Sequence, residues 1–289
     1  DKMVPYCGAL RPEETAARFE IDVPADRRID ASRLVIQYSP TLATAMVDAL
    51  PYLASYPYGC TEQTLNRFLP TVITQKILLD MGMDLGSIRE KRTNLNPQEL
   101  GDPAERAAQW QQYTENPVYD EAKVRDMVRD GVERLTAMQL SDGGWGWFSG
   151  WGERSYAHTT AYVVHGLQLA RENDVAIVPR VIDRGIAWLK QYQQRELRKL
   201  NNYENEQRKG KAHADNLDAF VFMVLVDAGI TDSEMNDHLY KDRTHLAVYA
   251  TAMYGLALHK LGDADRVAMI VRNIEQYLVR DEENQTAYL

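Results

Sequence analysis

This chain of 289 residues has no excess of positive charge, no long apolar run and only two cysteines. Lysine and arginine number 33 against 42 aspartates and glutamates, so the formal net charge is -9. Nucleic acid and anionic lipid surfaces are also negatively charged, so an acidic chain has no electrostatic reason to bind either. We therefore expect no nucleic-acid partner. No apolar run approaches the ~20 residues that a membrane-spanning helix needs.

The two cysteines are Cys7 and Cys60. They allow one disulfide but no disulfide framework, and they are too few for a zinc site built on cysteine. No His-Glu-x-x-His motif occurs, histidines and cysteines do not cluster at ligand spacing, and no glycine-rich phosphate loop is found. We therefore expect neither a metal nor a cofactor.

The two ends of the chain predict a fragment of a longer protein. No secretory signal follows Asp1, and Leu289 closes a run that reads as structured sequence, so we expect truncation at the C-terminus. A sequon at Asn284 matters only in a host that glycosylates.

The first forty residues differ in pattern from the rest. Residues 17–26 and 32–40 are rich in β-branched and aromatic side chains, and Leu34, Ile36 and Tyr38 alternate with residues of the opposite face. This period of two indicates strands, which cannot form a stable sheet alone. We predict a β-strand segment over residues 1–40 that is part of, or leads from, an adjacent β module.

From residue 41 to residue 289 the apolar residues follow the helical period. Aspartates after glycine stops, such as Asp232 and Asp263, are typical helix N-caps. Pro70 is expected to kink or restart its helix. Residues 85–118 are polar, and residues 94–103 read as a loop. Further helices are predicted near residues 119–140, 156–172, 179–200, 213–228, 232–240, 243–261 and 263–280.

Three of these segments, residues 159–170, 217–228 and 249–260, are apolar on nearly every side, whereas segments such as 181–200 have a polar face. A helix that is apolar all round is buried all round. Buried and half-exposed helices in alternation predict an all-α fold, an α/α toroid of helical hairpins in two layers. An irregular all-α bundle is the alternative. The densely charged residues 193–213 read as a solvated helix extension and loop.

The segment Gly59-Cys60-Thr61-Glu62-Gln63 has two interpretations. In the structural one, Gly59 makes a turn, Thr61 caps a helix, Glu62 suits the helix N-terminus, and Cys60 is a small buried hydrophobe. In the chemical one, the Cys60 thiol reaches the side-chain amide carbon of Gln63, and attack with loss of ammonia gives an internal thioester. The helix N-terminus favours the thiolate that this attack needs.

A thioester survives only where water and amines are kept out. Tyr56, Pro57 and Tyr58 are suited to form an apolar cover over Cys60, although aromatic core packing explains them equally well.

The Cys-x-Glu-Gln segment, preceded by glycine and entering a helix after an aromatic-proline run, resembles the thioester motif of the α2-macroglobulin and complement C3/C4 family. Residues 39–78 look like the bacterial α2-macroglobulins in particular. Animal members usually have glycine between the Cys and the Glu, so Thr61 departs from that pattern. The matches together span about residues 31–280.

The run "MQLSDGGWGWFSGW", residues 138–151, resembles the Gln-x-x-Asp-Gly-Gly-aromatic turn of α/α toroids, and residues 159–170 are similar to one of their inner helices. Gly143 and Gly144 permit a tight turn, and Trp145 and Trp147 fill the gap between hairpins.

The same tryptophans, with Trp151, could instead form a sugar-stacking platform. The alternative function is therefore a carbohydrate-active toroid enzyme or binding module. As an enzyme it would need a facing pair of carboxylates, for which Asp142 and Glu153 are the nearest candidates. A third interpretation is a helical scaffold with an inert Cys60.

Some family members pass the acyl group through a histidine to hydroxyl groups. No histidine here lies in a segment that matches that residue, and His158 and His165 read as core histidines on an inner helix. The resemblance therefore implies direct reaction with amines, chiefly lysine. The remaining candidates are His213, His238, His245 and His259.

The resemblance implies a thioester domain of a bacterial α2-macroglobulin-like protease inhibitor. Cleavage of a bait elsewhere in the parent uncovers the thioester, a protease lysine attacks the acyl carbon of Gln63, and Cys60 leaves as a thiol. Gly59, Glu62, Tyr56 and Tyr58 support the site. Each molecule acts once, so we expect a covalent trap rather than an enzyme. Its partners are target proteases and other domains of the parent, which is periplasmic or extracellular and membrane-anchored.

Overall fold

The computed structural model describes residues 16, 18, 20–32, 42–56, 59–91, 115–150, 152–204, 210–281 and 286–289. The α-helices of this part are α1 Leu42–Ser55, α2 Thr61–Asp80, α3 Leu85–Lys91, α5 Glu121–Met138, α6 Ala157–Glu172, α7 Pro179–Glu204, α8 Asn216–Asp227, α9 Ser233–Lys241, α10 Val248–Lys260 and α11 Ala264–Glu275. Three short 3-10 turns are η1 Ile29–Ala31, η2 Pro117–Tyr119 and η3 Arg243–His245. Strands β1 Val279–Asp281 and β2 Thr286–Tyr288 pair antiparallel, with Val279 opposite Tyr288.

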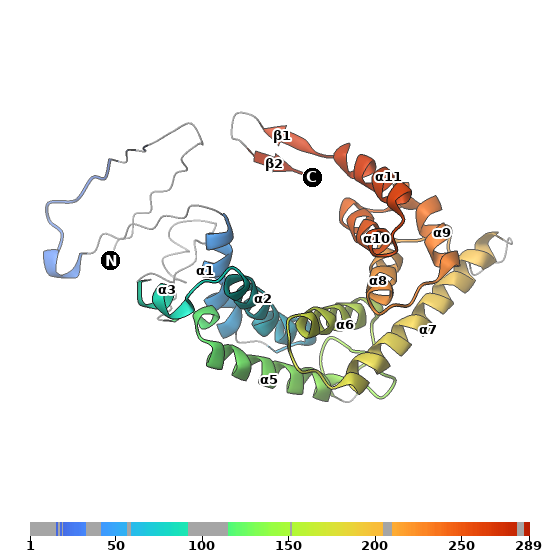
Figure 1. The fold of residues 1–289 in the computed structure, drawn as a ribbon, viewed down its shortest axis with the longest axis horizontal. Helices are drawn as coiled ribbons and strands as arrows, with labels where there is room; N and C mark the ends of the chain where they lie inside the picture. Colours follow the sequence, from blue (N-terminus) through green and yellow to red (C-terminus); the bar gives the residue numbers. More distant parts are fainter. Residues whose placement is uncertain are drawn as a thin grey trace.

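The helices follow an arc in two layers (Figure 1). Helices α2, α6, α8 and α10 succeed one another along its inner side, each packed on the next. Helix α5 covers α2, α7 covers α6 and α8, and α9 covers α8 from the outer side, while α11 packs on α10. The all-α prediction is confirmed, and the pairing of inner and outer helices is the hairpin arrangement expected of an α/α toroid.

Local sequence signals explain where the helices begin and end. The carboxylates of Asp120, Asp215, Asp232 and Asp263 accept hydrogen bonds from backbone N–H groups in the first turns of α5, α8, α9 and α11. These bonds satisfy donors that have no partner within the helix. Gly229 after α8 and Gly262 after α10 each have a φ of 76°, a left-handed conformation that suits glycine at a helix end. The predicted caps at Asp232 and Asp263 are confirmed.

The core lies between the two layers. Residues 218–226 of α8 are all buried, as expected for a helix that is apolar on every face. The Trp145 side chain is fully buried, and its indole Nε1 donates to the Leu135 carbonyl at 2.8 Å. A Cβ atom on Gly166 of α6 would lie 2.3 Å from a Leu65 methyl, so the glycine allows α2 and α6 to pack closely.

Four expectations need correction or stay open. The described part of the segment predicted as a strand over residues 17–26 forms no strand. The strand predicted over 32–40 lies mostly outside the described residues. Helix α3 was not predicted in the polar stretch 85–118, and the loop expected over residues 94–103 lies outside the described residues. Helix α2 runs through Pro70 without restarting. The helix predicted over 263–280 ends at Glu275, and strand β1 follows.

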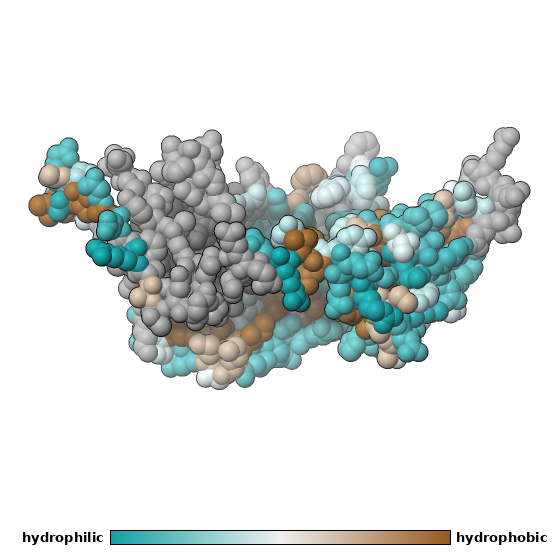
Figure 2. Space-filling model, turned by 90° about the horizontal axis from the view of Figure 1, so that it is seen from above, coloured by the Kyte–Doolittle hydropathy of each residue, from teal (hydrophilic) through white to brown (hydrophobic). Residues whose placement is uncertain are grey.

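Hydrophilic residues cover most of the described surface in Figure 2, and hydrophobic residues gather in patches between them. Within the part of the chain that the structure describes, no helix is long and apolar enough to cross a membrane.

Candidate functional site

Cys60 is the N-cap of helix α2, and Gln63 is the third residue of the helix. Cys60 has extended backbone angles, φ -66° and ψ 170°. Its N–H donates to Oε1 of Gln63 at 3.2 Å, while the N–H of Gln63 faces the Cys60 side chain. This is a capping box in which cysteine replaces the usual serine or threonine. A capping box requires its two residues to be three positions apart, which is the spacing of Cys60 and Gln63. The Cys-x-Glu-Gln motif therefore coincides with the start of helix α2.

The box fixes how the Gln63 amide is turned. A backbone N–H can only donate, so the atom that faces it is the carbonyl oxygen Oε1. The amide carbon, bonded to that oxygen, is thereby brought back to residue 60. Cys60 is a free cysteine, and the side chains of Cys60 and Gln63 are both half-buried. The Cys60 carbonyl accepts from both the N–H and the hydroxyl of Thr64, each at 2.9 Å, which holds the first turn.

Thr61 attaches this turn to a loop more than eighty residues away. Its hydroxyl donates to the Gly146 carbonyl at 2.7 Å, and its N–H donates to the Trp147 carbonyl at 3.0 Å. The Thr61 side chain is fully buried. The sequence assigned Trp147 to a turn between hairpins, and it did not indicate that this loop meets the cysteine segment.

Two arginines brace the residues that precede the box. Arg134 of α5 donates to the Gly59 carbonyl at 3.1 Å, and Arg67 of α2 donates to the Tyr56 carbonyl at 2.8 Å. The Tyr56 ring is half-buried and meets the Tyr52 ring edge to face, with centroids 5.7 Å apart. Tyr58 and Pro57 lie outside the described residues.

Glu62 is exposed, and its charge acts on Tyr162 of α6. Burial raises the pKa of the Tyr162 phenol, and the negative Glu62 raises it further. The phenol donates to Oδ1 of Asn66 at 2.6 Å, one turn beyond Gln63, and the His158 ring stacks on it with centroids 6.4 Å apart. Neither Tyr162 nor Asn66 was singled out from the sequence.

The carboxylates proposed for a carbohydrate enzyme hold the tryptophan loop together. Burial alone would raise the pKa of Asp142, but hydrogen bonds from Ser155, Gly144 and Trp188 hold it below its usual value. Glu153 accepts from the Phe148 N–H at 3.1 Å. Trp145 is buried, so of the described tryptophans in this loop Trp147, 44% exposed, could stack on a sugar. Trp151 lies outside the described residues.

The histidines are held by other contacts. Burial lowers the pKa of His165, against the charges of Asp227 and Glu172. The His213 and His245 rings stack 3.9 Å apart, and His213 lies 3.2 Å from a carboxylate oxygen of Asp242. His238 is buried on α9, and His259 is in the last turn of α10.

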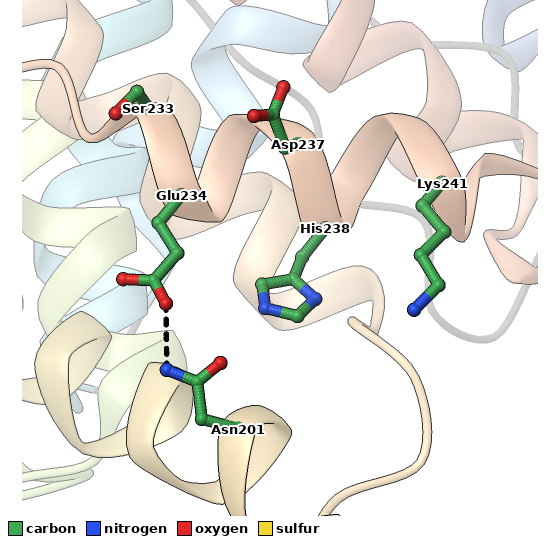
Figure 3. A pocket seen from close by; sticks show the side chains of 6 residues that line it. All are labelled: Asn201, Ser233, Glu234, Asp237, His238 and Lys241. Carbon is green, nitrogen blue, oxygen red and sulfur yellow. Dashed lines mark hydrogen bonds between the residues drawn. The ribbon is translucent and has the colours of Figure 1, made fainter. Parts of the chain in front are cut away.

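A hollow of about 420 Å³ lies between the end of α7 and α9 (Figure 3). One side of it is closed by the hydrogen bond of 2.7 Å from Asn201 to Glu234. Its walls come from these two helices and not from the start of α2. Within the described residues, no group of histidine, cysteine and carboxylate side chains is placed to hold a metal ion.

Comparison with known proteins found no matching family model. The chain is 26% identical over 157 residues to an alpha-2-macroglobulin of Thermotoga maritima, covering 54% of the chain and 8% of the relative. It is 27% identical over 277 residues to the Escherichia coli alpha-2-macroglobulin, covering 91% and 14%. It is 22% identical over 235 residues to thioester-containing protein 1 of Anopheles gambiae, covering 79% and 15%.

Among solved structures, native Escherichia coli alpha-2-macroglobulin from domain MG7 to the C-terminus matches with a TM-score of 0.52 and 22% identity, over 83% of this chain and 32% of that one. A cryo-EM structure of the same protein in its native conformation matches with a TM-score of 0.54 and 22% identity, over 84% and 13%. At this identity the likeness shows the fold.

The two-layered helical fold defines a domain of the α/α type. In sequence and in fold, the chain is similar to part of the bacterial alpha-2-macroglobulins. The chain spans 8 to 15% of the length of the curated relatives, so it corresponds to one part of such proteins.

Proposed function

We propose that Cys60 and Gln63 form an internal thioester and that the protein uses it to capture attacking proteases covalently through their lysines. The observation that carries this proposal is the capping box, in which the Cys60 N–H holds Oε1 of Gln63 at 3.2 Å. An ordinary serine or threonine N-cap offers the same box without a thiol.

Thioester formation needs no reactant beyond the two side chains. The Cys60 thiolate attacks the Gln63 amide carbon, an S–C bond forms, the C–N bond breaks, and the nitrogen leaves as ammonia with the thiol proton. Negative charge develops on Oε1 during the attack. The Cys60 N–H already faces that oxygen and stabilises it, and the helix N-terminus favours the oxyanion.

Capture is the second acyl transfer at the same carbon. The neutral amine of a protease lysine attacks the acyl carbon, an amide bond forms, and Cys60 leaves as the thiolate and takes up the proton that the amine gives up. The bond to the protease is permanent, so one molecule acts once and is a trap rather than a turnover enzyme. A Salmonella alpha-2-macroglobulin structure similar in fold to this chain was reacted with methylamine, which is a primary amine.

The site must be covered until a protease arrives. Cys60 and Gln63 are each half-buried, and the exposed Trp147 follows the carbonyl that holds Thr61. Other domains of the same parent chain would complete the cover, and cleavage of a bait segment there would remove it. We place the parent in the periplasm or outside the cell, anchored to the membrane, where foreign proteases are met.

The test mixes the protein with trypsin and looks for a complex that survives denaturation. We expect a covalent complex with the wild-type protein and none with Cys60→Ser or Gln63→Glu. Gln276→Glu, an exposed residue just after α11, is the matched control and should still capture. Trypsin with fully dimethylated lysines should escape, because a tertiary amine cannot form the amide. Equal capture of native and dimethylated trypsin would contradict the lysine route.

A further inference from the structure

We infer that Thr61 is the positioning residue that locks the Cys60–Gln63 box onto the loop of residues 145–148, so that the position of this loop controls the lifetime of the thioester. The inference rests on the proposed thioester and adds its regulation. The juxtaposition that carries it is the pair of hydrogen bonds from Thr61 to the carbonyls of Gly146 and Trp147.

Thr61 lies between the two reacting residues and is fully buried. Its bonds to the loop, 2.7 Å from the hydroxyl and 3.0 Å from the N–H, fix the rotation of the first turn of α2. The distance from the Cys60 sulfur to the Gln63 amide carbon depends on that rotation, because the two side chains leave the chain on either side of Thr61. Removal of the hydroxyl would also leave the buried Gly146 carbonyl without its donor.

The loop that receives these bonds is tied to two other helices. The Trp145 N–H donates to the Thr160 hydroxyl of α6 at 2.9 Å, and its indole donates to the Leu135 carbonyl of α5 at 2.8 Å. Glu153 accepts from the Phe148 N–H at 3.1 Å, which holds the loop at its other end. The box is therefore held by the α5–α6 connection and not by α2 alone.

The same loop presents exposed aromatic side chains to its surroundings. Trp147 is 44% exposed and Phe148 is 62% exposed. A contact that pulls or releases these side chains moves the carbonyls that hold Thr61. The loop thus connects what happens at the surface to the reactivity of the acyl carbon.

The test compares Thr61→Val, which removes the hydroxyl at nearly constant shape, with Thr61→Ser, which keeps it. Thr71→Val is the matched control, because Thr71 is a buried threonine on the same helix whose hydroxyl has no hydrogen-bond partner among the described residues. Each variant is followed by intact mass and by release of the Cys60 thiol, in water and in methylamine, with its melting temperature recorded.

We expect thiol release to be about tenfold faster in Thr61→Val, the effect of one lost buried hydrogen bond. Thr61→Ser and Thr71→Val should match the wild type. A folded Thr61→Val protein with wild-type release rates would overturn the inference. A faster rate in Thr71→Val would overturn it too, since the effect would then follow from any threonine lost from this helix.

Gly146→Ala approaches the same contact from the loop, in case Thr61→Val does not fold. A Cβ there would lie 2.3 Å from the Glu153 side chain, so either the loop shifts or Glu153 moves away from its hydrogen bond with the Phe148 N–H, while Thr61 is unchanged. Faster thiol release supports the inference, and a wild-type rate in the folded variant contradicts it. If the wild-type protein itself never loses ammonia, the proposed function fails along with the inference, whereas a thioester that is indifferent to Thr61 contradicts the inference alone.

Discussion

At the scale of single residues, a thiol at a helix N-cap differs from a hydroxyl in what it can do next. Serine or threonine would complete the capping box with Gln63 and stop there. Cysteine makes the same contact and is also a nucleophile. The contact between Cys60 and Gln63 thus begins a helix and also places two groups that can react. For that reason the sequence allowed both a structural and a chemical interpretation of this segment.

The thiol of Cys60 should be masked in the untreated protein. We expect iodoacetamide to leave Cys60 unlabelled until methylamine has opened the thioester, and to label it fully afterwards. Peptide mapping measures this, with Cys60→Ser as the control that isolates any labelling of Cys7. Full labelling of Cys60 before methylamine would show that no thioester protects it.

Asp218 should make the stability of the fold depend on pH, independently of the Cys60–Gln63 site. Its side chain is fully buried 2.6 Å from the Lys211 ammonium. Burial and the nearby Asp215 raise its pKa to about 6 from 3.8, although Lys211 works against them. The folded state therefore binds this proton more tightly than the unfolded state. The stabilisation from this proton is complete below about pH 4 and is lost as the pH rises through about 6.

Replacing Asp218 by Asn removes this titration. Urea unfolding of the wild type and of Asp218→Asn across that pH window should give a stability difference that changes by up to about 3 kcal/mol. Asp215→Asn, which neutralises a more exposed neighbour, should change the slope less. A difference that stays constant with pH would contradict the assignment.

The residue contacts that the sequence could not supply are those between distant segments. The capping spacing predicted that Cys60 and Gln63 lie close together. It could not predict that Thr61 meets Gly146, or that Tyr162 meets Asn66, because those pairs depend on how α2, α6 and the intervening loop pack. Arg134 at the Gly59 carbonyl is a contact of the same kind.

At the scale of elements, the helices α5 to α11 were predictable because their signals are local. Aspartate caps stand directly before α5, α8, α9 and α11, and a glycine follows the ends of α8 and α10 within two residues. Helix α3 was missed since it is short and opens a polar stretch, and strand β1 was read as helix because its pairing with β2 is not local.

Helix α2 is seated on α5 by close contact at a glycine. A Cβ on Gly131 would lie 2.3 Å from the Phe68 ring, which is itself fully buried. We expect Gly131→Ala to lower the free energy of unfolding by about 1–3 kcal/mol through overpacking, despite its better helix propensity. Chemical denaturation measures this.

Gly86→Ala in α3 is the matched control for Gly131→Ala. The nearest atom to a Cβ there is 3.4 Å away, so the substitution should be neutral or slightly stabilising. Equal effects of the two substitutions would show that the α2–α5 contact is looser than described.

At the scale of the whole molecule, the arc places the start of α2 where one outer helix and one loop meet it. Helix α5 reaches Gly59 through Arg134, and the α5–α6 loop reaches Thr61. The all-α class and the layered hairpins follow from helix periodicity in the sequence. The boundary between residues 40 and 41, and any neighbouring β module, stay predictions.

The central claim is the bond between Cys60 and Gln63, and the mass of the untreated protein tests it most directly. The account predicts an intact mass lower than that of the encoded sequence by one ammonia, with the loss mapped to the peptide that holds both residues. A peptide in which Gln63 keeps its carboxamide and Cys60 is a free thiol would contradict it.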